Sequence, residues 1–310
     1  MLRRLLQRRA WPRGQKPFDD DDPRPRLAIG VSVFDWAFDI KARQIARVLT
    51  DWQVRISDRE CQPAVQADVL VSLWWLDLPY LRRLVEAPRA LLGVYSHSCW
   101  RLQPQAFAEA CKLADGILAA NETLKEELGE FTDLPIYVCP DTVDMGLFPL
   151  QPYPDRWTLG WCGSDYTDCF ADDYKGVNLL RLAAAQENVP FMVQPFQKRI
   201  PHERMAKDFY AGISAYACAS IAEGGPNPVL EALSCGRPII TTPVGAAKDV
   251  VRPGETGLFI ERKGPSVRAA IRELRTWPLN GELAARCRAS LTSTWTDPGP
   301  AWRAALTRTP

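Results

Sequence analysis

The sequence of 310 residues has no long hydrophobic run. No stretch approaches the roughly 18 consecutive apolar residues that a membrane-spanning helix needs, so we expect no transmembrane segment. The first residues, Met-Leu-Arg-Arg-Leu-Leu-Gln-Arg-Arg, lack the apolar centre of a secretory signal peptide. The net charge is only +1, which gives no general attraction to nucleic acid or to an anionic membrane. These features predict a cytoplasmic protein.

Several well-known signatures are missing as well. Nine cysteines are scattered without a Cys-x-x-Cys pair, which is typical of reduced, mostly buried thiols. No Gly-x-Gly-x-x-Gly follows the first predicted strand, which argues against an enzyme that uses NAD. The absence of a Walker loop argues against a P-loop NTPase, and the absence of a Gly-x-Ser-x-Gly elbow argues against an α/β-hydrolase.

Short apolar runs rich in β-branched residues alternate with helical patterns along most of the chain. One series of strands extends from Leu27–Val33 to Ile136–Cys139, and a second extends from Leu159–Gly163 to Gly257–Ile260. Such alternation predicts parallel sheets with helices on their faces. We therefore expect an α/β fold made of two Rossmann-like domains with a cleft between them.

The boundaries follow from these two series. We expect the first domain at residues 27–150 and the second at residues 151–290. Residues 291–310 form a C-terminal tail that either crosses back onto the first domain or simply packs Trp295 and Trp302 into a core. Residues 1–26 form a tail that is basic and then acidic. The acidic run Asp19–Asp22 is expected to be a solvated linker rather than an Asp-x-Asp metal site. Residues 1–16 are interpreted as a disordered tail, with contact to an anionic membrane or to nucleic acid as alternatives.

The most informative stretch is Glu-Gly-Gly-Pro-Asn-Pro-Val-Leu-Glu, which begins at Glu223 and ends at Glu231. It follows a predicted strand and opens a predicted helix, with Asn227 expected as N-cap and Pro228 as the first helical residue. The amide groups at such a helix start have no partners within the helix and favour a phosphate or diphosphate.

Different residues of this stretch are expected to bind different parts of a ligand. Prolines lack an amide hydrogen, so the expected donors are the backbone NH groups of Asn227, Val229 and Leu230, and Gly224 and Gly225 let the backbone approach a ligand. The two carboxylates can each accept hydrogen bonds from a sugar diol. The alternative is that Glu231 only complements the helix dipole and Glu223 is a solvated loop residue.

The segment Ser220–Gly245 resembles the retaining family-4 glycosyltransferases, which have the GT-B fold. The similarity extends beyond the two glutamates to the Cys-Gly-x-Pro turn and the Thr-x-x-Gly loop that follow them. The resemblance implies that Glu223 binds the transferred sugar and that Glu231 binds the ribose of the nucleotide. It also identifies Ile136–Phe148 as the segment that connects the two domains.

Lys175-Gly176 resembles the Lys-Gly at the start of a helix in the nucleotide domain of this family, where the lysine contacts the diphosphate. The sequence departs from the family just before it. An arginine usually follows the glycine of the preceding strand, whereas Gly163 is followed by Ser164. Either another cation substitutes, with Lys198 and Arg199 as candidates, or the diphosphate is bound more weakly.

The remaining candidates come from the first domain and from the second histidine. His97 follows an apolar strand, and the resemblance implies that it reaches the transferred sugar; a structural role is the alternative. Asp35, Trp36 and Asp39 are candidates for an acceptor pocket, with hydrophobic packing as the alternative for Trp36. His202 precedes a helix and is interpreted as a surface or capping residue.

By this resemblance the protein is expected to be a retaining glycosyltransferase that needs no metal and no cofactor. Its partners would be a nucleotide-sugar donor and a hydroxyl acceptor such as a glycan or a lipid-linked glycan, in the cytoplasm or at the inner face of a membrane. Two other functions remain open, a sugar-nucleotide epimerase or hydrolase and a binding protein without activity. A modified nucleic-acid base is an alternative acceptor.

Overall fold

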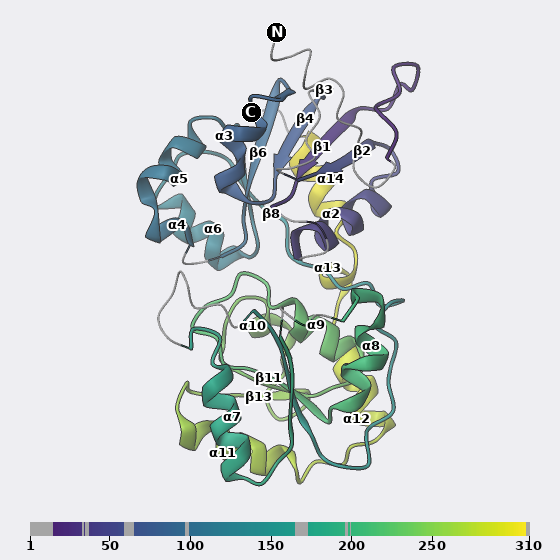
Figure 1. Cartoon of the computed structure of the whole chain (residues 1–310), viewed down its shortest axis with the longest axis vertical. Coiled ribbons are helices and arrows are strands. Elements are labelled where there is room, and N and C mark those ends of the chain that lie inside the picture. The colour runs from purple at the N-terminus through teal and green to yellow at the C-terminus, as the bar shows by residue number, and fades with distance from the viewer. Residues whose placement is uncertain are drawn as a thin grey trace. The chain divides into compact units, whose positions relative to one another are not determined.

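The structure is a computed structural model of the chain, and it describes residues 15–32, 34, 37–58, 65–96, 99–164, 173–195, 198 and 200–307. The chain divides into two compact units (Figure 1). Unit 1 comprises Met1–Asp141 and Asp297–Pro310, and unit 2 comprises Thr142–Thr296. The division therefore falls between Asp141 and Thr142, several residues before the expected boundary at residue 150.

Unit 1 contains a six-stranded parallel sheet in the order β2-β1-β4-β6-β7-β8. Its strands are β1 (Arg26–Gly30), β2 (Gln53–Ser57), β4 (Val69–Ser72), β6 (Arg89–Val94), β7 (Gly116–Ala119) and β8 (Ile136–Val138), and β3 (Val65–Gln66) pairs separately with β5 (Val85–Glu86). Its helices include α2 (Ala37–Val48), α3 (Leu78–Leu81), α4 (Cys99–Leu102), α5 (Pro104–Cys111), α6 (Glu122–Gly129) and α14 (Gly299–Thr307).

The sheet of unit 1 is covered on both faces because its strands are apolar at successive positions. Leu27 and Ile29 pack toward α2 and α14, whereas Ala28 between them packs toward the cluster that contains Trp75 and Phe107. Side chains alternate between the faces of a strand, so a strand that is apolar throughout needs cover on both sides. This pattern is the physical reason for the layered α/β architecture.

Unit 2 contains a five-stranded parallel sheet in the order β10-β9-β11-β12-β13. Its strands are β9 (Leu159–Gly163), β10 (Phe191–Pro195), β11 (Ala215–Cys218), β12 (Ile239–Thr241) and β13 (Gly257–Phe259). Its helices include α7 (Val177–Gln186), α8 (Met205–Asp208), α9 (Asn227–Ser234), α10 (Ala247–Val250), α11 (Gly264–Leu274), α12 (Gly281–Ala289) and α13 (Ser293–Thr296), with the short 3-10 helices η4 (His202–Arg204) and η5 (Tyr210–Gly212).

The two tryptophans of the C-terminal segment are buried in different units. Trp295 belongs to the core of unit 2, and its carbonyl accepts a hydrogen bond from the amide of Val143 at 2.8 Å. Trp302 on α14 is fully buried in the core of unit 1, where Arg89 donates to the carbonyl of Leu306 at 2.6 Å. In Figure 1 the yellow helix α14 accordingly lies among the purple and blue elements of unit 1.

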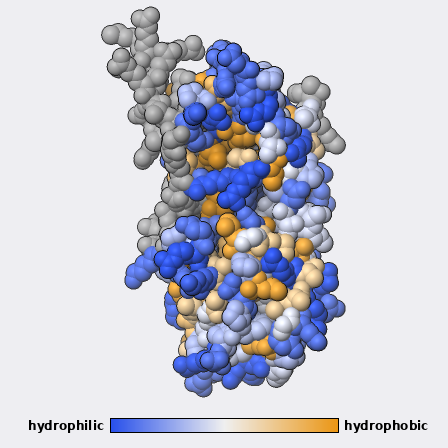
Figure 2. Space-filling model, turned by 90° about the vertical axis from the view of Figure 1, so that its right-hand side faces the viewer, coloured by the Kyte–Doolittle hydropathy of each residue, from blue (hydrophilic) through white to orange (hydrophobic). Residues whose placement is uncertain are grey.

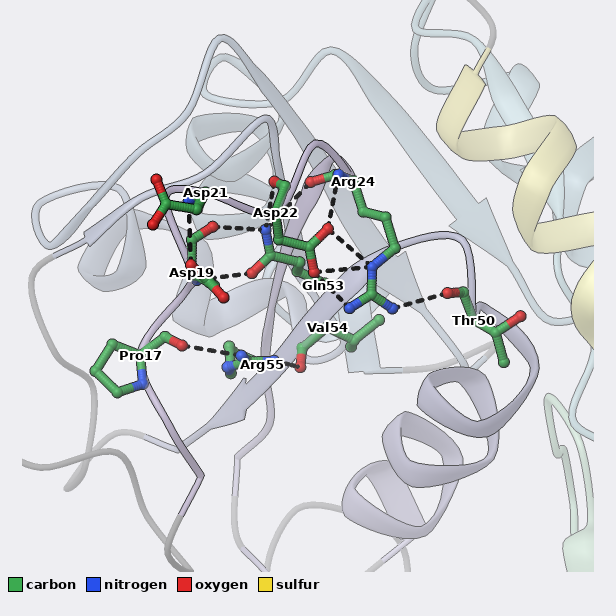
Figure 3. A network of polar contacts seen from close by, with 9 residues as sticks. All are labelled: Pro17, Asp19, Asp21, Asp22, Arg24, Thr50, Gln53, Val54 and Arg55. Carbon is green, nitrogen blue, oxygen red and sulfur yellow. Dashed lines mark hydrogen bonds and ion pairs between the residues drawn. The ribbon is translucent and has the colours of Figure 1, made fainter.

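The backbone of the acidic run ahead of β1 is held against the sheet, whereas Asp19, Asp20 and Asp21 are exposed, as expected for a solvated segment (Figure 3). Gln53 of β2, which is 2% exposed, accepts from the amide of Asp19 and donates to the carbonyls of Asp19, Asp22 and Arg24. Arg24 pairs with Asp22 at 2.5 Å. A buried amide side chain needs partners for both its oxygen and its nitrogen, and this backbone supplies them.

A buried ion pair fixes the end of unit 1 to α2. The Nζ of Lys41 lies 2.8 Å from Oδ1 of Asp141 and 3.5 Å from the centroid of the Tyr95 ring. Burial lowers the pKa of Lys41, and the charge of Asp141 opposes this effect. Asp141 belongs to the segment that resembles the connection between the two domains, and Lys41 holds it from within unit 1.

No helix among the described residues is both long and apolar enough to cross a bilayer. Figure 2 shows a face on which hydrophilic residues predominate and hydrophobic residues are exposed in separate small groups. The cysteines that the structure describes have free thiols, and five of these six are buried.

Candidate functional site

The stretch Glu223–Glu231 follows β11 at the carboxyl end of the sheet of unit 2. In open parallel sheets this is the edge at which ligands bind. Helix α9 begins at Asn227 with Pro226 as its N-cap, one residue earlier than expected, and the buried Oδ1 of Asn227 accepts no hydrogen bond from the described residues. The prediction of Asn227 as N-cap was therefore wrong, because the proline itself adopts the flanking conformation and Asn227 becomes the first helical residue.

Two of the three expected amide donors already have partners in their own loop. The amide of Asn227 donates to the carbonyl of Gly225 at 2.9 Å, and that of Val229 donates to the carbonyl of Pro226 at 2.8 Å. A diphosphate at this helix start would compete with those carbonyls. The amide of Leu230 belongs to the first turn of the same helix.

The loop after β12 packs directly on the backbone of Glu223 and Gly224. A Cβ atom on Gly245 would lie 2.5 Å from the carbonyl oxygen of Gly224 and 2.6 Å from that of Glu223, and Gly245 has a φ of 46°. Thr242 supports the same contact, since its hydroxyl donates to the carbonyl of Ser220 at 2.7 Å. The Thr-x-x-Gly pattern thus serves to hold the backbone that carries Glu223.

Lys175 and Glu223 meet although they are 48 positions apart in the sequence. The Nζ of Lys175 lies 2.5 Å from Oε1 of Glu223, and the hydroxyl of Ser220 donates to the same oxygen at 2.7 Å. The side chain of Lys175 is 32% exposed and that of Glu223 is 17% exposed, so both reach the surface. Burial opposes the charge of Lys175, but Glu223 outweighs it, and the net effect raises the pKa of Lys175.

Glu231 is bound by two protein donors, one on each carboxylate oxygen. The Nε2 of His202 lies 2.9 Å from Oε1, and the hydroxyl of Tyr210 donates to Oε2 at 2.7 Å. The interpretation of His202 as a surface or capping residue was therefore wrong, because its ring is partly buried against Phe148 and faces Glu231. A local pattern shows only that His202 precedes a helix, and the contact spans 29 positions of sequence.

Arg262 is a second cation near this site that the sequence analysis missed. It follows β13, and its Nε donates to the carbonyl of Ala219 at 3.0 Å, while its Nη2 donates to the carbonyl of Asp173. The carboxylate of Asp173 in turn accepts from the amides of Asn178 and Leu179 at the start of α7. Arg262 therefore joins the turn that carries Lys175 to the end of β11.

Replacement of Arg262 by glutamine tests this function. The shorter side chain cannot reach both carbonyls, so we expect a loss of about 1–2 kcal/mol in the free energy of unfolding. Thermal unfolding of both proteins measures the loss. Arg252→Gln, on the loop after α10, provides a control at another exposed arginine, and an equal loss in both variants would contradict a specific role.

The structure describes some of the other candidate site residues and not others. Gly163 ends β9 and Ser164 follows it, while Lys198 is exposed. Asp39 lies in the first turn of α2, is 1% exposed, and binds Arg43 at 2.6 Å, so its carboxylate is already engaged within unit 1. His97, Asp35, Trp36 and Arg199 lie outside the described residues.

A surface hollow of about 610 Å³ lies elsewhere, at the amino-terminal ends of the strands in unit 1. Asp22, Arg24 and Arg26 line it, and these arginines pair with Asp22 and Asp20. Its charges thus satisfy one another, at the edge of a parallel sheet opposite to that where ligands bind. In the described ranges, no three His, Cys, Asp or Glu side chains are grouped to hold a metal ion. The candidate site therefore comprises the ion pair of Lys175 with Glu223 and, on the helix that follows, Glu231 with its partners His202 and Tyr210.

Comparison with known proteins shows similarity in one segment of the sequence and in the fold. Residues 169–291 match the family model of "Glycosyl transferases group 1". No curated protein sequence matched the chain. Among solved structures, sucrose-phosphate synthase from Thermosynechococcus elongatus is similar with a TM-score of 0.69 and 15% identity, over 91% of this chain and 98% of that one.

Two further structures have the same architecture. Anabaena HepE in complex with UDP and glucose is similar with a TM-score of 0.69 and 12% identity, over 92% of this chain and 100% of that one. The lipopolysaccharide outer core galactosyltransferase WaaB is similar with a TM-score of 0.60 and 14% identity, over 91% of this chain and 98% of that one. The chain thus has the GT-B fold of these proteins, and the segment that matches the group 1 model, residues 169–291, lies within unit 2.

Proposed function

We propose that this protein transfers a sugar from a nucleotide-sugar donor to an acceptor hydroxyl, with retention of the anomeric configuration. The observation that carries the proposal is the contact between Lys175 and Glu223 at the carboxyl end of β11, in the segment that matches the family. This contact joins a cation to the carboxylate that we propose binds the sugar. The UDP and glucose in the HepE structure support a nucleotide and a sugar as ligands of such a site.

The residues of unit 2 divide among the parts of the donor. Glu231 would accept hydrogen bonds from the ribose, and Glu223 from the sugar, through Oε2, because both Lys175 and Ser220 bind Oε1. Lys175 would lie where the diphosphate departs. A fixed cation at a site of developing charge typically stabilises the transition state by several kcal/mol, about 3 for one strong donor.

In the reaction proposed here, the bond between the anomeric carbon and the phosphate oxygen breaks, and the nucleoside diphosphate leaves with the electron pair. The acceptor oxygen attacks from the same face, and its proton passes to the departing phosphate oxygen. Attack on that face gives retention. Lys175 supplies the charge that the leaving group requires, so we also propose that no metal ion takes part, and that EDTA leaves the rate unchanged.

Nucleotide binding is the first test. We expect one of UDP, GDP and ADP to raise the melting temperature of the wild type, since a ligand at about 100 times its Kd adds roughly 2.7 kcal/mol of stability. Glu231→Ala should lose this shift. The exposed Glu255→Ala serves as the matched control and should retain it. If none of the three nucleotides stabilises the wild type, the proposal is wrong, and a GT-B protein without a donor site is the better description.

Turnover separates transfer from its alternatives. With the nucleotide sugar of the identified base, transfer predicts release of the nucleoside diphosphate that accelerates when an acceptor is added, with a glycoside as product. A free sugar or an epimer as the only product would instead identify a hydrolase or an epimerase. Proton NMR of the glycoside reports the anomeric configuration, and an inverted product would contradict retention.

A further inference from the structure

Glu231 is held in place by hydrogen bonds from the protein to both of its carboxylate oxygens. Its side chain is 11% exposed, and each of its two oxygens already accepts one hydrogen bond from the protein. A carboxylate offers about four acceptor positions, two on each oxygen. One position therefore remains on each oxygen, which is the arrangement that receives two neighbouring hydroxyl groups.

Tyr210 is fixed from several sides. Its ring is fully buried and packs edge-on against Phe148, with ring centroids 5.8 Å apart. Its carbonyl accepts from the Nε of Arg237 at 2.9 Å, and its hydroxyl lies 3.6 Å from the Sγ of Cys162 at the end of β9. Burial, together with Cys162 and Glu231, raises the pKa of Tyr210 well above its usual value, so the hydroxyl keeps its proton and donates to Glu231.

His202 is held less tightly and can change its charge. Its ring lies 5.1 Å from that of Phe148 and its side chain is 21% exposed. Burial opposes its protonation, but the hydrogen bond to Glu231 and the charge of that carboxylate outweigh burial and raise the pKa of His202 above its usual value. His202 therefore keeps its proton to a higher pH than an unperturbed histidine does.

We propose that Tyr210 and His202 are positioning residues that aim Glu231 at the 2′- and 3′-hydroxyl groups of the donor nucleotide, and that His202 makes nucleotide affinity depend on pH. This inference rests on the proposed function. It assigns a specificity for ribonucleotides over 2′-deoxyribonucleotides, because an acceptor position of a buried carboxylate that finds no hydroxyl is left unsatisfied.

The direction of the pH effect follows from the charged groups around the imidazole of His202. Three carboxylates act on this imidazole: Glu231 on α9, Glu203 on its own element η4, and Asp144 on the segment before Phe148. On the other side of Glu231 lie Tyr210 of η5 and, beside the Tyr210 hydroxyl, Cys162 of β9. Burial also raises the pKa of Cys162, which therefore stays a neutral thiol. A protonated His202 offsets the negative charge of Glu231 beside an anionic nucleotide. Affinity is therefore higher below the raised pKa and falls as the pH rises through it.

The test compares UDP, GDP and ADP with dUDP, dGDP and dADP, by calorimetric titration of the full chain between pH 5.5 and 8.5. We expect the wild type to bind one ribonucleotide about 10-fold or more tightly than its deoxy form. Tyr210→Phe keeps the buried ring but removes the donor, and should reduce this ratio to near 1. His202→Gln keeps an NH donor without a titratable charge, and should retain the ratio but lose the pH dependence attributed to His202.

Comparison at each pH uses the same nucleotide for all variants, so titration of its phosphate cancels. Lys207→Ala, an exposed change close to His202, should behave as the wild type. If the wild type binds none of the six nucleotides, the proposed function fails, and this inference fails with it. If the wild type binds but Tyr210→Phe keeps the ratio, or His202→Gln keeps the wild-type pH profile, the inference alone is overturned.

Discussion

Exchange of Lys175 for alanine is expected to lower kcat/KM about 10²- to 10³-fold, with most of the loss in kcat. The reason is that the charge of the leaving diphosphate develops in the transition state, where a fixed cation contributes most. The ion pair of 2.5 Å with Glu223 places that cation beside the residue expected to hold the sugar. Initial rates of nucleoside diphosphate release, measured over a range of donor concentrations, give both constants.

Two further variants separate charge from position. Lys175→Arg keeps the charge but replaces a compact ammonium with a planar fork, so we expect partial activity. Glu223→Gln keeps the shape and the hydrogen bond from Ser220 but breaks the ion pair. Because the two residues touch, the double variant should lose less than the product of the single losses. Losses that simply multiply, or a Lys175→Ala enzyme with normal kcat, would contradict a joint action at the departing group.

Gly176→Ala is expected to destabilise unit 2 by about 2–5 kcal/mol, whereas Gly254→Ala should cost only about 1–2 kcal/mol. The two glycines have nearly the same left-handed backbone, with φ of 72° and 79°. They differ in their surroundings. A Cβ atom on Gly176 would lie 2.4 Å from the carbonyl oxygen of Ala219, whereas nothing lies within 4 Å of a Cβ atom on Gly254.

This pair of variants therefore isolates steric overlap from backbone strain. Urea unfolding followed by circular dichroism measures the two losses. We further expect Gly176→Ala to lose the stabilisation by a nucleotide, because the overlap displaces the turn that carries Lys175, while Gly254→Ala retains it. Equal losses in the two variants would mean that backbone strain alone explains the presence of glycine, and that the contact of Gly176 with Ala219 does not affect stability.

The layered architecture could be predicted from the sequence because it depends on local patterns. Strands such as Leu27–Gly30 are apolar at every position, and this holds whatever lies beside them in space. The motif from Glu223 to Glu231 could be placed between strand and helix for the same reason, since glycine and proline act on their own backbone. The predicted helix start was wrong by one residue, because adjacent residues at a helix end can each serve as the N-cap.

The contacts of the candidate site could be predicted less well, because each joins distant parts of the chain. His202 meets Glu231 only because the segment after β10 packs over α9, and nothing in the residues around His202 encodes that contact. Arg262 reaches Ala219 and Asp173 across the sheet edge. The last helix α14 belongs to unit 1 because Trp302 is buried there, while Trp295 is buried in unit 2.

The α/β class, the two series of strands and the pair of glutamates with Lys175 could be predicted from the sequence, since these follow from periodicity and from residue types at short spacing. The donors that hold Glu223 and Glu231, the point where the chain divides, and the pairing of Asp39 with Arg43 depend on the packing of each unit. The physical reason is that hydrogen bonds and ion pairs depend on distances of about 3 Å between atoms, and the packing of the whole unit sets those distances.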